Sequence, residues 1–248
     1  MLGALRVGIA GLVLALGVSA VPAAEVSVAV AANFTKVAEE LAVAFKAATG
    51  DDLKLSFGAT GALYAQITQG APFEVFLAAD HERPQRAVDD GFGVAGAAFT
   101  YAVGKLVLYS PTVDVGDGVA VLNAGAFEHL AIADPETAPY GAAAVEAMTA
   151  LGLNEALGPK LVIGGNVSQA LQFVESGNAE LGFVALSQAI GRTGGYQWLV
   201  PAGLYTPIRQ DAVLLKTGES NPAARAFLDF LRSDEAVAVI EKAGYTVE

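Results

Sequence analysis

The chain has 248 residues, of which 54% are hydrophobic and 16% charged, so it can build a large apolar core and is not a disordered protein. Its formal net charge of −12 argues against nucleic acids and anionic membranes as partners, because both repel an acidic surface. It contains no cysteine, which excludes disulfide bonds and thiolate chemistry.

Residues 1–24 have the layout of a cleavable signal peptide. A short segment with one positive charge precedes an apolar run at residues 7–19, and small residues follow up to Ala24. The alternative is a membrane anchor, but a span needs roughly 20 apolar residues and this run is shorter. No cysteine follows the run, which excludes a lipid anchor. We therefore expect export to a bacterial periplasm, with cleavage after Ala23 or Ala24.

Strand-like apolar runs alternate with helix-like patterns along the rest of the chain. Strands are expected at residues 26–31, 53–57, 75–79, 106–110, 130–134, 161–163, 181–186 and 213–216. Helices are expected around residues 34–45, 63–67, 83–90, 142–151, 167–175, 222–231 and 235–243. This alternation predicts an α/β fold with mostly parallel sheets.

The number of strand–helix units exceeds what one compact sheet requires, which favours two lobes. We expect residues 25–104 and 210–248 to form lobe I, and residues 105–209 to form lobe II. Two extended-looking segments, residues 101–106 and 205–212, are the candidate crossings between them. The second crossing returns the chain to lobe I.

Four turns join a predicted strand to the next helix, at residues 31–35, 58–61, 134–141 and 164–168. In open parallel sheets, ligands bind where the strands end and the helices begin. Each helix start offers backbone N–H groups that lack an intrahelical acceptor, and small residues let a ligand approach them. Asn33, Thr60 and Tyr140 add neutral donors, and no turn carries Lys, Arg or His. Donors without cations suit an anion.

Each of these residues also has a purely structural interpretation. Asn33 and Thr60 are ordinary helix-cap residues, Tyr140 fits a surface aromatic, and Val167 fits a core position. The ligand interpretation depends on the coincidence of four such turns in one exported chain.

Signatures of catalysis are weak. Residues 91–96 match G-x-G-x-x-G, but they do not follow a strand and no helix clearly opens after them, so a dinucleotide site is rejected. His81 and His129 lie far apart, without cysteines or the spacing of metal ligands. Asp134 and Glu136 are close in sequence but lie in a loop that is expected to be solvated. We therefore expect a binding protein without a cofactor rather than an enzyme.

Four stretches together resemble the periplasmic molybdate-binding proteins of bacterial ABC transporters, in the same order and spacing over nearly the whole mature chain. They are VAVAANFTKVAEELAVAFKAATG, SFGATGALYAQITQGAPFEVFLAAD, ADPETAPYGAAA and LGFVALSQA. The resemblance implies a two-lobed periplasmic binding protein fold of type II, with two crossing strands as a hinge. It also implies closure on molybdate or tungstate, delivery to an inner-membrane permease, and a monomeric protein.

The resemblance implies that neutral donors at the four turns hold the oxyanion. The residues so assigned are Asn33, Ala32, Thr60, Ala59, Tyr140 and Val167, the last through its amide. Some family members place a tyrosine hydroxyl on the anion from the stretch written here as LGFVALSQ, where this chain has Ala185. We expect Tyr140 to supply that aromatic donor from its own turn instead.

A site made only of donors favours some anions over others. Molybdate and tungstate are fully deprotonated near neutral pH and only accept hydrogen bonds. Phosphate carries a proton that such a site leaves unpaired, which disfavours it. Sulfate carries none, so its exclusion follows from the resemblance alone. Three alternatives stay open: a protein of the same fold for sulfate, thiosulfate or an organic anion; a periplasmic enzyme such as a transferase; and a signalling or adhesion module.

Overall fold

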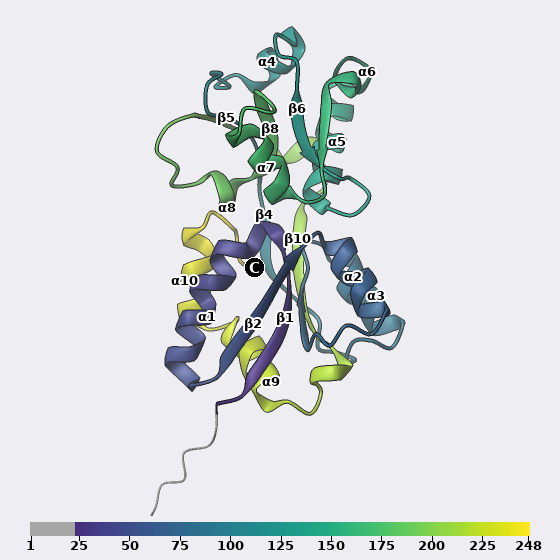
Figure 1. The fold of residues 1–248 in the computed structure, drawn as a ribbon, viewed down its shortest axis with the longest axis vertical. Coiled ribbons are helices and arrows are strands. Elements are labelled where there is room, and N and C mark those ends of the chain that lie inside the picture. The colour runs from purple at the N-terminus through teal and green to yellow at the C-terminus, as the bar shows by residue number, and fades with distance from the viewer. Residues whose placement is uncertain (1–22) are drawn as a thin grey trace, which may run out of the picture.

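The structure, a computed structural model, describes residues 23–248 and contains two five-stranded sheets that lie end to end along the long axis of the molecule (Figure 1). The signal peptide predicted for residues 1–24 lies almost entirely outside the described residues and stays a prediction. Within residues 23–248, no helix is long and apolar enough to cross a membrane.

The first sheet has the strand order β2-β1-β3-β10-β4. Its strands are β1 (Glu25–Ala31), β2 (Asp52–Gly58), β3 (Val75–Leu77), β4 (Phe99–Gly104) and β10 (Ile208–Leu214). The first three run parallel, and β10 is antiparallel to both β3 and β4. Helices α1 (Thr35–Thr49), α9 (Pro222–Phe230) and α10 (Asp234–Lys242) cover one face, and α2 (Thr60–Thr68) and α3 (Glu82–Asp89) cover the other (Figure 1).

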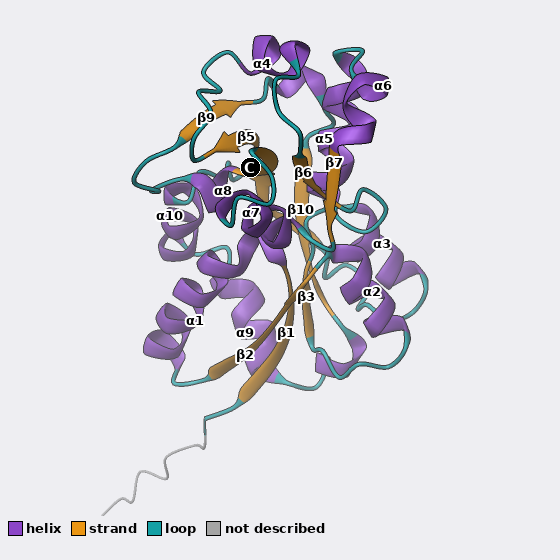
Figure 2. Cartoon of the chain, turned by 45° about the horizontal axis from the view of Figure 1, so that its top comes forward, coloured by secondary structure: helices purple, strands orange, loops and turns teal. Residues whose placement is uncertain are grey.

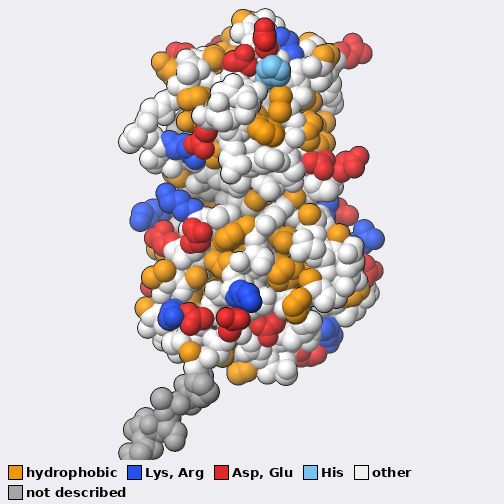
Figure 3. Space-filling view, in the orientation of Figure 1, with side chains coloured by type: hydrophobic (Ala, Val, Ile, Leu, Met, Phe, Trp, Pro, Cys, Tyr) orange, Lys and Arg blue, Asp and Glu red, His pale blue; other side chains and the backbone are white. Residues whose placement is uncertain are grey.

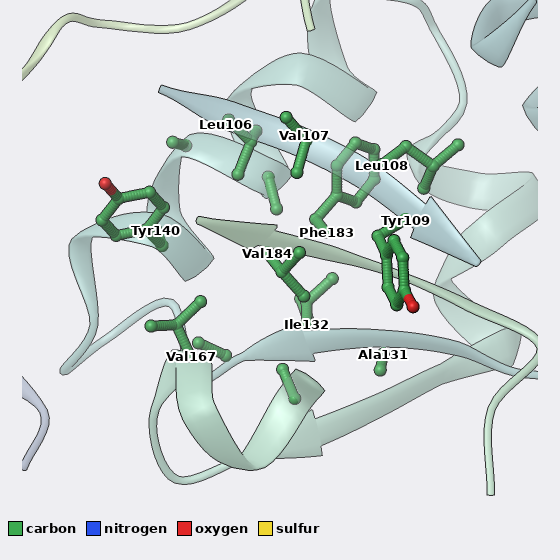
Figure 4. Close-up of a cluster of buried hydrophobic side chains, with 14 of the residues drawn as sticks. Leu106, Val107, Leu108, Tyr109, Ala131, Ile132, Tyr140, Val167, Phe183 and Val184 are labelled. Atoms are coloured by element: carbon green, nitrogen blue, oxygen red, sulfur yellow. The ribbon is translucent and has the colours of Figure 1, made fainter. Parts of the chain in front are cut away.

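The second sheet has the order β7-β6-β8-β5-β9. Its strands are β5 (Leu106–Ser110), β6 (Leu130–Ala133), β7 (Leu161–Gly164), β8 (Leu181–Ala185) and β9 (Tyr196–Leu199). The helices of this half are α4 (Gly118–Ala124), α5 (Pro139–Ala150), α6 (Asn154–Leu157), α7 (Val167–Glu175) and α8 (Leu186–Ala189). Fully buried apolar side chains of β5, β6 and β8 form its core, as Figure 4 shows for Leu106, Ile132 and Val184.

Short 3-10 turns complete the described elements: η1 (Ala32–Phe34), η2 (Gly158–Lys160), η3 (Ala202–Leu204) and η4 (Lys216–Gly218). The predicted α/β alternation and two-lobed fold are confirmed, but each sheet is mixed rather than mostly parallel, because β4, β10, β5 and β9 take part in antiparallel pairs. The strands β4 and β9 and the helix α4 were not among the predicted elements. Most of β9 is solvent-exposed, so it lacks the apolar alternation that marks a half-buried strand.

The chain passes between the two sheets twice at nearly the same place. Lys105 alone joins β4 to β5. Strand β10 brings the chain back into the first sheet, beside β3 (Figure 2). The predicted strand at residues 213–216 overlaps only the last part of β10, which begins at Ile208. Polar residues in the first half of β10 interrupt its apolar pattern, so the sequence predicts only the last part of the strand. A register shift relative to β4 falls between Gln210 and Asp211, and both side chains are buried at this junction.

Candidate functional site

The four turns that the sequence predicts meet at one small cavity between the two sheets. Counted together with the solvent-open space at its mouth, the cavity measures about 200 Å³, and uncharged residues line it. The lining residues are Ala31, Ala32, Asn33, Gly58, Ala59, Thr60, Ala79, Ala138, Pro139, Tyr140, Asn166 and Val167. The first two turns come from the first sheet and the other two from the second, so a bound molecule would contact both halves of the protein.

Three α-helices begin at this cavity. Thr60 is the first residue of α2, Pro139 of α5 and Val167 of α7, while the 3-10 turn η1 supplies the fourth start. The first N–H groups of each helix have no intrahelical acceptor, and the helix dipole makes this end positive. Asn166 caps its own helix by accepting the N–H of Gln169 at 3.1 Å. The cavity therefore combines positive helix ends with the absence of any acidic lining residue.

Thr60 combines burial with a defined hydroxyl geometry. Its side chain is 1% exposed, and Oγ1 accepts the backbone N–H of Ala79 at 3.0 Å. The hydroxyl thus uses a lone pair on the protein and keeps its proton for another acceptor. The alternative interpretation of Thr60 as a helix cap is wrong, because Ala59 occupies the N-cap position and Thr60 makes no capping bond.

Asn33 lies in η1 and is 4% exposed. Its Nδ2 donates to Oε1 of Gln210 at 2.8 Å and to the hydroxyl of Tyr245 at 2.9 Å. Both amide hydrogens therefore point to residues behind the cavity. The Asn33 donor that remains for a ligand is the backbone N–H, at the second residue of η1. Asn33 is not a helix cap either, since it makes no capping bond.

Tyr140 is fully buried rather than a surface aromatic. Its hydroxyl lies 3.4 Å from Nε2 of Gln210, and a Cβ added at Gly104 would meet this hydroxyl at 2.1 Å. Burial raises the pKa of the Tyr140 hydroxyl well above its ordinary value. Figure 4 shows the ring at the end of the apolar cluster, near Val167. The hydroxyl thus faces the crossing strands, and the backbone N–H is the donor that Tyr140 brings to the start of α5.

Val167 and Ala185 differ in their relation to the cavity. Val167 is 4% exposed, packs in the core of the second sheet and also lines the cavity at the first position of α7. The core interpretation is therefore confirmed for the side chain, while the assignment of the amide to a ligand stays a prediction. Ala185 ends β8, is fully buried and does not line the cavity.

The two halves touch each other on both sides of the cavity. The N–H of Gly61 donates to the carbonyl of Thr137 at 2.8 Å, and Nη2 of Arg83 donates to the carbonyl of Glu136 at 3.0 Å. On the other side, Oγ of Ser168 donates to the carbonyl of Ala32 at 3.2 Å. The structure is therefore a closed arrangement of the two lobes.

Gln188 adds a further contact across the same boundary. Its Nε2 donates to Oγ of Ser168 at 2.7 Å and to the carbonyl of Ala32 at 3.2 Å. Its Oε1 is buried and, within residues 23–248, has no hydrogen-bond partner. A rotated amide would place Oε1 against the Ala32 carbonyl, so the observed orientation is the better one.

The acidic pair of the third turn stabilises its own loop. Oδ1 of Asp134 accepts the N–H of Glu136 at 3.0 Å, and Oδ2 accepts the hydroxyl of Thr137 at 2.9 Å. Asp134 therefore shapes the turn that leads into α5. It does not form a paired-carboxylate site with Glu136, whose backbone rather than side chain is the bonded group.

A wider opening beside the cavity has a different chemistry. Its charged lining residues include Asp80, His81, Arg83, Glu146 and Arg209. Arg83 pairs with Asp80, and Nδ1 of His81 lies 2.6 Å from a carboxylate oxygen of Asp211. Arg83 and Asp80 thus neutralise each other, and the Asp211 carboxylate also accepts the hydroxyl of Thr100. In the described part of the chain, no three His, Cys, Asp or Glu side chains are grouped to hold a metal ion.

Several residues around the cavity were not found from the sequence. Ala79 follows β3 and orients Thr60, but a lone alanine after a strand carries no recognisable signal. Gln210 and Tyr245 contact Asn33 from 177 and 212 positions away in the sequence. Contacts of such separation follow from the topology and have no local pattern.

Residues 26–246 match the model of a family described as bacterial extracellular solute-binding protein. The chain belongs to this family. Such proteins bind solutes and are not enzymes, in agreement with the weak catalytic signatures in the sequence.

Two relatives of this solute-binding protein cover almost its full length. The molybdate-binding protein ModA of Rhodobacter capsulatus is 56% identical over 98% of this chain and 97% of the relative. The protein of the same name from Azotobacter vinelandii is 55% identical over 96% of this chain and 97% of the relative. A solved periplasmic molybdate-binding protein of Azotobacter vinelandii has a TM-score of 0.84 at 39% identity, covering 90% of this chain and 99% of that structure.

Proposed function

We propose that this solute-binding protein captures molybdate in the bacterial periplasm and delivers it to the permease of an ABC transporter. The observation that carries the proposal is the uncharged cavity at which three helix starts and the turn η1 converge. The names of the two full-length relatives support the same ligand. Tungstate has the same shape and charge, and we propose that it is bound as well.

The proposed ligand set follows the four turns. The hydroxyl of Thr60 and the backbone N–H groups of Asn33, Tyr140 and Val167 are the proposed donors, with Ala32 and Ala59 forming the cavity wall beside them. A tetrahedral dianion presents four acceptor oxygens and no proton. A wall made of donors can therefore bond every oxygen without leaving a ligand proton unpaired.

We propose a hinge mechanism for capture. Lobe I comprises residues 25–104 and 210–248, lobe II comprises residues 105–209, and the crossings beside Lys105 and within β10 act as the hinge. The open form binds the anion on one lobe, and the other lobe then closes over it. A monomer in this closed form is the species that we propose the permease recognises, after residues 1–24 have been removed as a signal peptide.

On the face in Figure 3, the middle of the waist between the lobes is formed by uncharged surface, with charged side chains to either side. The acidic net charge of the protein therefore acts on an incoming anion mainly from a distance. Salt screens charges beyond about 8–10 Å under physiological conditions, whereas donors inside a closed cleft act at short range. This difference is consistent with an acidic protein that takes up an anion.

A thermal-shift screen with sodium molybdate, tungstate, sulfate and phosphate, followed by calorimetry, tests the function. Molybdate and tungstate should raise the melting temperature strongly, since a ligand at a hundred times its Kd adds about 2.7 kcal/mol of stability. Phosphate should have little effect because its proton finds no acceptor. A larger response to sulfate, or no response to any of the four anions, would contradict the proposal.

A further inference from the structure

Behind the cavity, a second group of buried polar side chains links the two lobes. This junction network consists of Asn33, Tyr101, Tyr140, Ser187, Gln210 and Tyr245. Four of its members, namely Tyr101, Ser187, Gln210 and Tyr245, do not line the cavity. All six side chains are neutral, and none is more than 8% exposed. Such a network calls for a physical explanation, because burial of a polar group costs free energy unless the group is hydrogen-bonded.

Gln210 occupies the centre of the network. Its side chain is completely buried at the register shift of β10. Oε1 accepts Nδ2 of Asn33 at 2.8 Å, and Nε2 donates to the hydroxyl of Tyr140 at 3.4 Å. One amide on the crossing strand thus connects the first ligand turn, in lobe I, with the third ligand turn, in lobe II.

Tyr245 holds the same asparagine from the other side. Its hydroxyl accepts the second Nδ2 hydrogen of Asn33 at 2.9 Å and lies within donating distance of the Asn33 carbonyl and of Oγ of Ser187, at 3.0 and 2.9 Å. Ser187, in lobe II, itself donates to the Asn33 carbonyl at 2.9 Å. The Tyr245 ring packs edge-on against Phe34, with the ring centres 5.4 Å apart.

The C-terminal segment that carries Tyr245 is tied to the hinge. Thr246 exchanges backbone hydrogen bonds with Val103 of β4, at 2.7 and 3.1 Å. The phenol is therefore held in place by the strand that crosses to lobe II. Burial raises the pKa of Tyr245 to about 12, so its hydroxyl stays protonated wherever the protein is folded under ordinary conditions.

We propose that Gln210 and Tyr245 are positioning residues of the oxyanion site. They hold the Nδ2 group of Asn33 between them, and so place the backbone N–H of the first turn against the anion. Through Tyr140 and Ser187, they make this placement depend on the closed arrangement of the lobes. The inference rests on the proposed function, because it concerns affinity for the same anion.

The geometry predicts that loss of the Gln210 or the Tyr245 acceptor destabilises the closed form more than the open form. Without the Tyr245 hydroxyl, an Asn33 N–H loses its acceptor and Ser187 loses a neighbour in a place that water does not reach. When lobe II moves away, water can replace the missing group. The substitution therefore destabilises the closed, liganded form more than the open form, and we expect faster release of the anion.

The test measures binding of sodium molybdate by calorimetry and stopped-flow in the full mature chain. Tyr245→Phe and Gln210→Met should each raise Kd by about tenfold, the effect of one buried hydrogen bond lost. The Asn33→Ala variant provides the second half of a double-mutant cycle. Adding Tyr245→Phe to Asn33→Ala should raise Kd by clearly less than the product of the two single effects, because the phenol acts through Asn33.

Tyr64→Phe is the matched control. Tyr64 is 9% exposed, and its hydroxyl donates to Asp90; neither residue lines the cavity or belongs to the junction network. This variant should keep the wild-type Kd. Unchanged affinity in Tyr245→Phe and Gln210→Met, or a lower melting temperature of the free protein at unchanged Kd, would overturn the positioning role. Absence of molybdate binding in the wild type would instead contradict the proposed function itself.

Discussion

A threonine hydroxyl has one proton and two lone pairs, and at Thr60 the protein uses only a lone pair. The N–H of Ala79 supplies that bond at 3.0 Å, so the proton is left for a ligand. The same side chain is almost completely buried, which keeps water from competing. A single residue thus acquires a fixed donor direction from a backbone group just after the next strand, β3.

Replacement of Thr60 should weaken anion binding strongly. Thr60→Ala removes a donor to a charged ligand, worth about 1.5–3 kcal/mol, so the Kd for molybdate should rise by about tenfold to a hundredfold. Thr60→Ser keeps the hydroxyl and should stay close to the wild type. Calorimetry of the three proteins checks this, and an alanine variant with wild-type affinity would remove Thr60 from the proposed ligand set.

The buried tyrosines predict how the protein responds to alkali. Burial raises the pKa of Tyr245 to about 12 and moves that of Tyr101 and Tyr140 well above the ordinary value of about 10. A folded-state pKa above the unfolded one means that the unfolded chain loses its protons first. The stability is therefore complete below about pH 10 and declines as the pH rises toward about 12.

Ultraviolet absorbance of phenolate and circular dichroism, recorded together between about pH 9 and pH 12, test this expectation. The phenolate signal of these three tyrosines should appear together with the loss of helical structure. Full ionisation of all the tyrosines while the helical signal is still intact would contradict it.

At the residue scale, the sequence identified donor-rich turns but not the partners that orient them. Asn33, Thr60, Tyr140 and Val167 stand next to helix starts, and such positions can be read from local patterns. The direction of each side chain cannot be read in this way. Whether the hydroxyl of Tyr140 faces the cavity depends on Gln210, which is 70 positions away.

Among the elements, α5 shows how closely a helix that begins at the cavity can pack against a strand. A Cβ added at Gly141, in the first turn of this helix, would lie 2.2 Å from the carbonyl oxygen of Ala133 at the end of β6. The helix can approach the strand only because this residue is glycine. The approach also fixes the position of the Tyr140 N–H, one residue earlier.

Gly141→Ala should therefore affect stability and binding together. The added methyl group forces α5 away from β6, which should lower the free energy of unfolding by about 1–3 kcal/mol, as other overpacked cores do. The Kd for molybdate should rise as well, because the helix start moves. Urea denaturation and calorimetry measure the two effects.

Gly158→Ala is the control for this variant. An added Cβ at Gly158 meets no atom within 4 Å, so the substitution should leave both quantities near the wild-type values. Equal behaviour of the two glycine variants would mean that the close approach of α5 to β6 is unimportant.

Elements with strong periodicity could be predicted, and elements at the junction could not. The helix α1 buries Val37, Leu41 and Phe45 on one face, and this spacing is visible in the sequence. In β10, by contrast, Arg209, Gln210 and Asp211 interrupt the apolar pattern, although two of them are buried. Their burial is explained by hydrogen bonds to distant residues, which a local pattern does not contain.

For the whole molecule, closure depends on how near two backbones can come. Gly61 in α2 donates its N–H to Thr137 in the other lobe, and a Cβ added there would lie 3.1 Å from the Thr137 carbonyl oxygen and from Nη2 of Arg83. This contact exists only when the lobes are together. A methyl group at this position thus acts mainly on the closed form, because the Thr137 backbone cannot move aside as the end of the Arg83 side chain can.

Gly61→Ala should separate affinity from stability. Alanine favours a helix by about 0.5–1 kcal/mol relative to glycine, so the melting temperature of the free protein should not fall. The Kd for molybdate should nevertheless rise severalfold through faster release, because the closed lobes must shift apart. Thermal melting and stopped-flow release kinetics give the two values, and unaltered release would show that this contact does not limit closure.

The two-lobed architecture could be predicted because strand–helix units repeat along the chain, and the resemblance gave their assembly. The closeness of the lobes could not, since it depends on small residues such as Gly61 and Gly104, whose neighbours belong to distant segments. A glycine in a sequence does not reveal which backbone it allows to approach.

The side-chain oxygen Oε1 of Gln188, buried at the boundary between the lobes, affects the balance between the open and closed forms of the unliganded protein. In the closed form this oxygen has no hydrogen-bond partner among residues 23–248, which costs about 1–3 kcal/mol where water does not reach it, whereas separation of the lobes exposes it to water. A bound anion offsets that cost through its own hydrogen bonds to the protein. If the protein captures and releases an anion as proposed, the unpaired atom thus favours the open form once the anion has left.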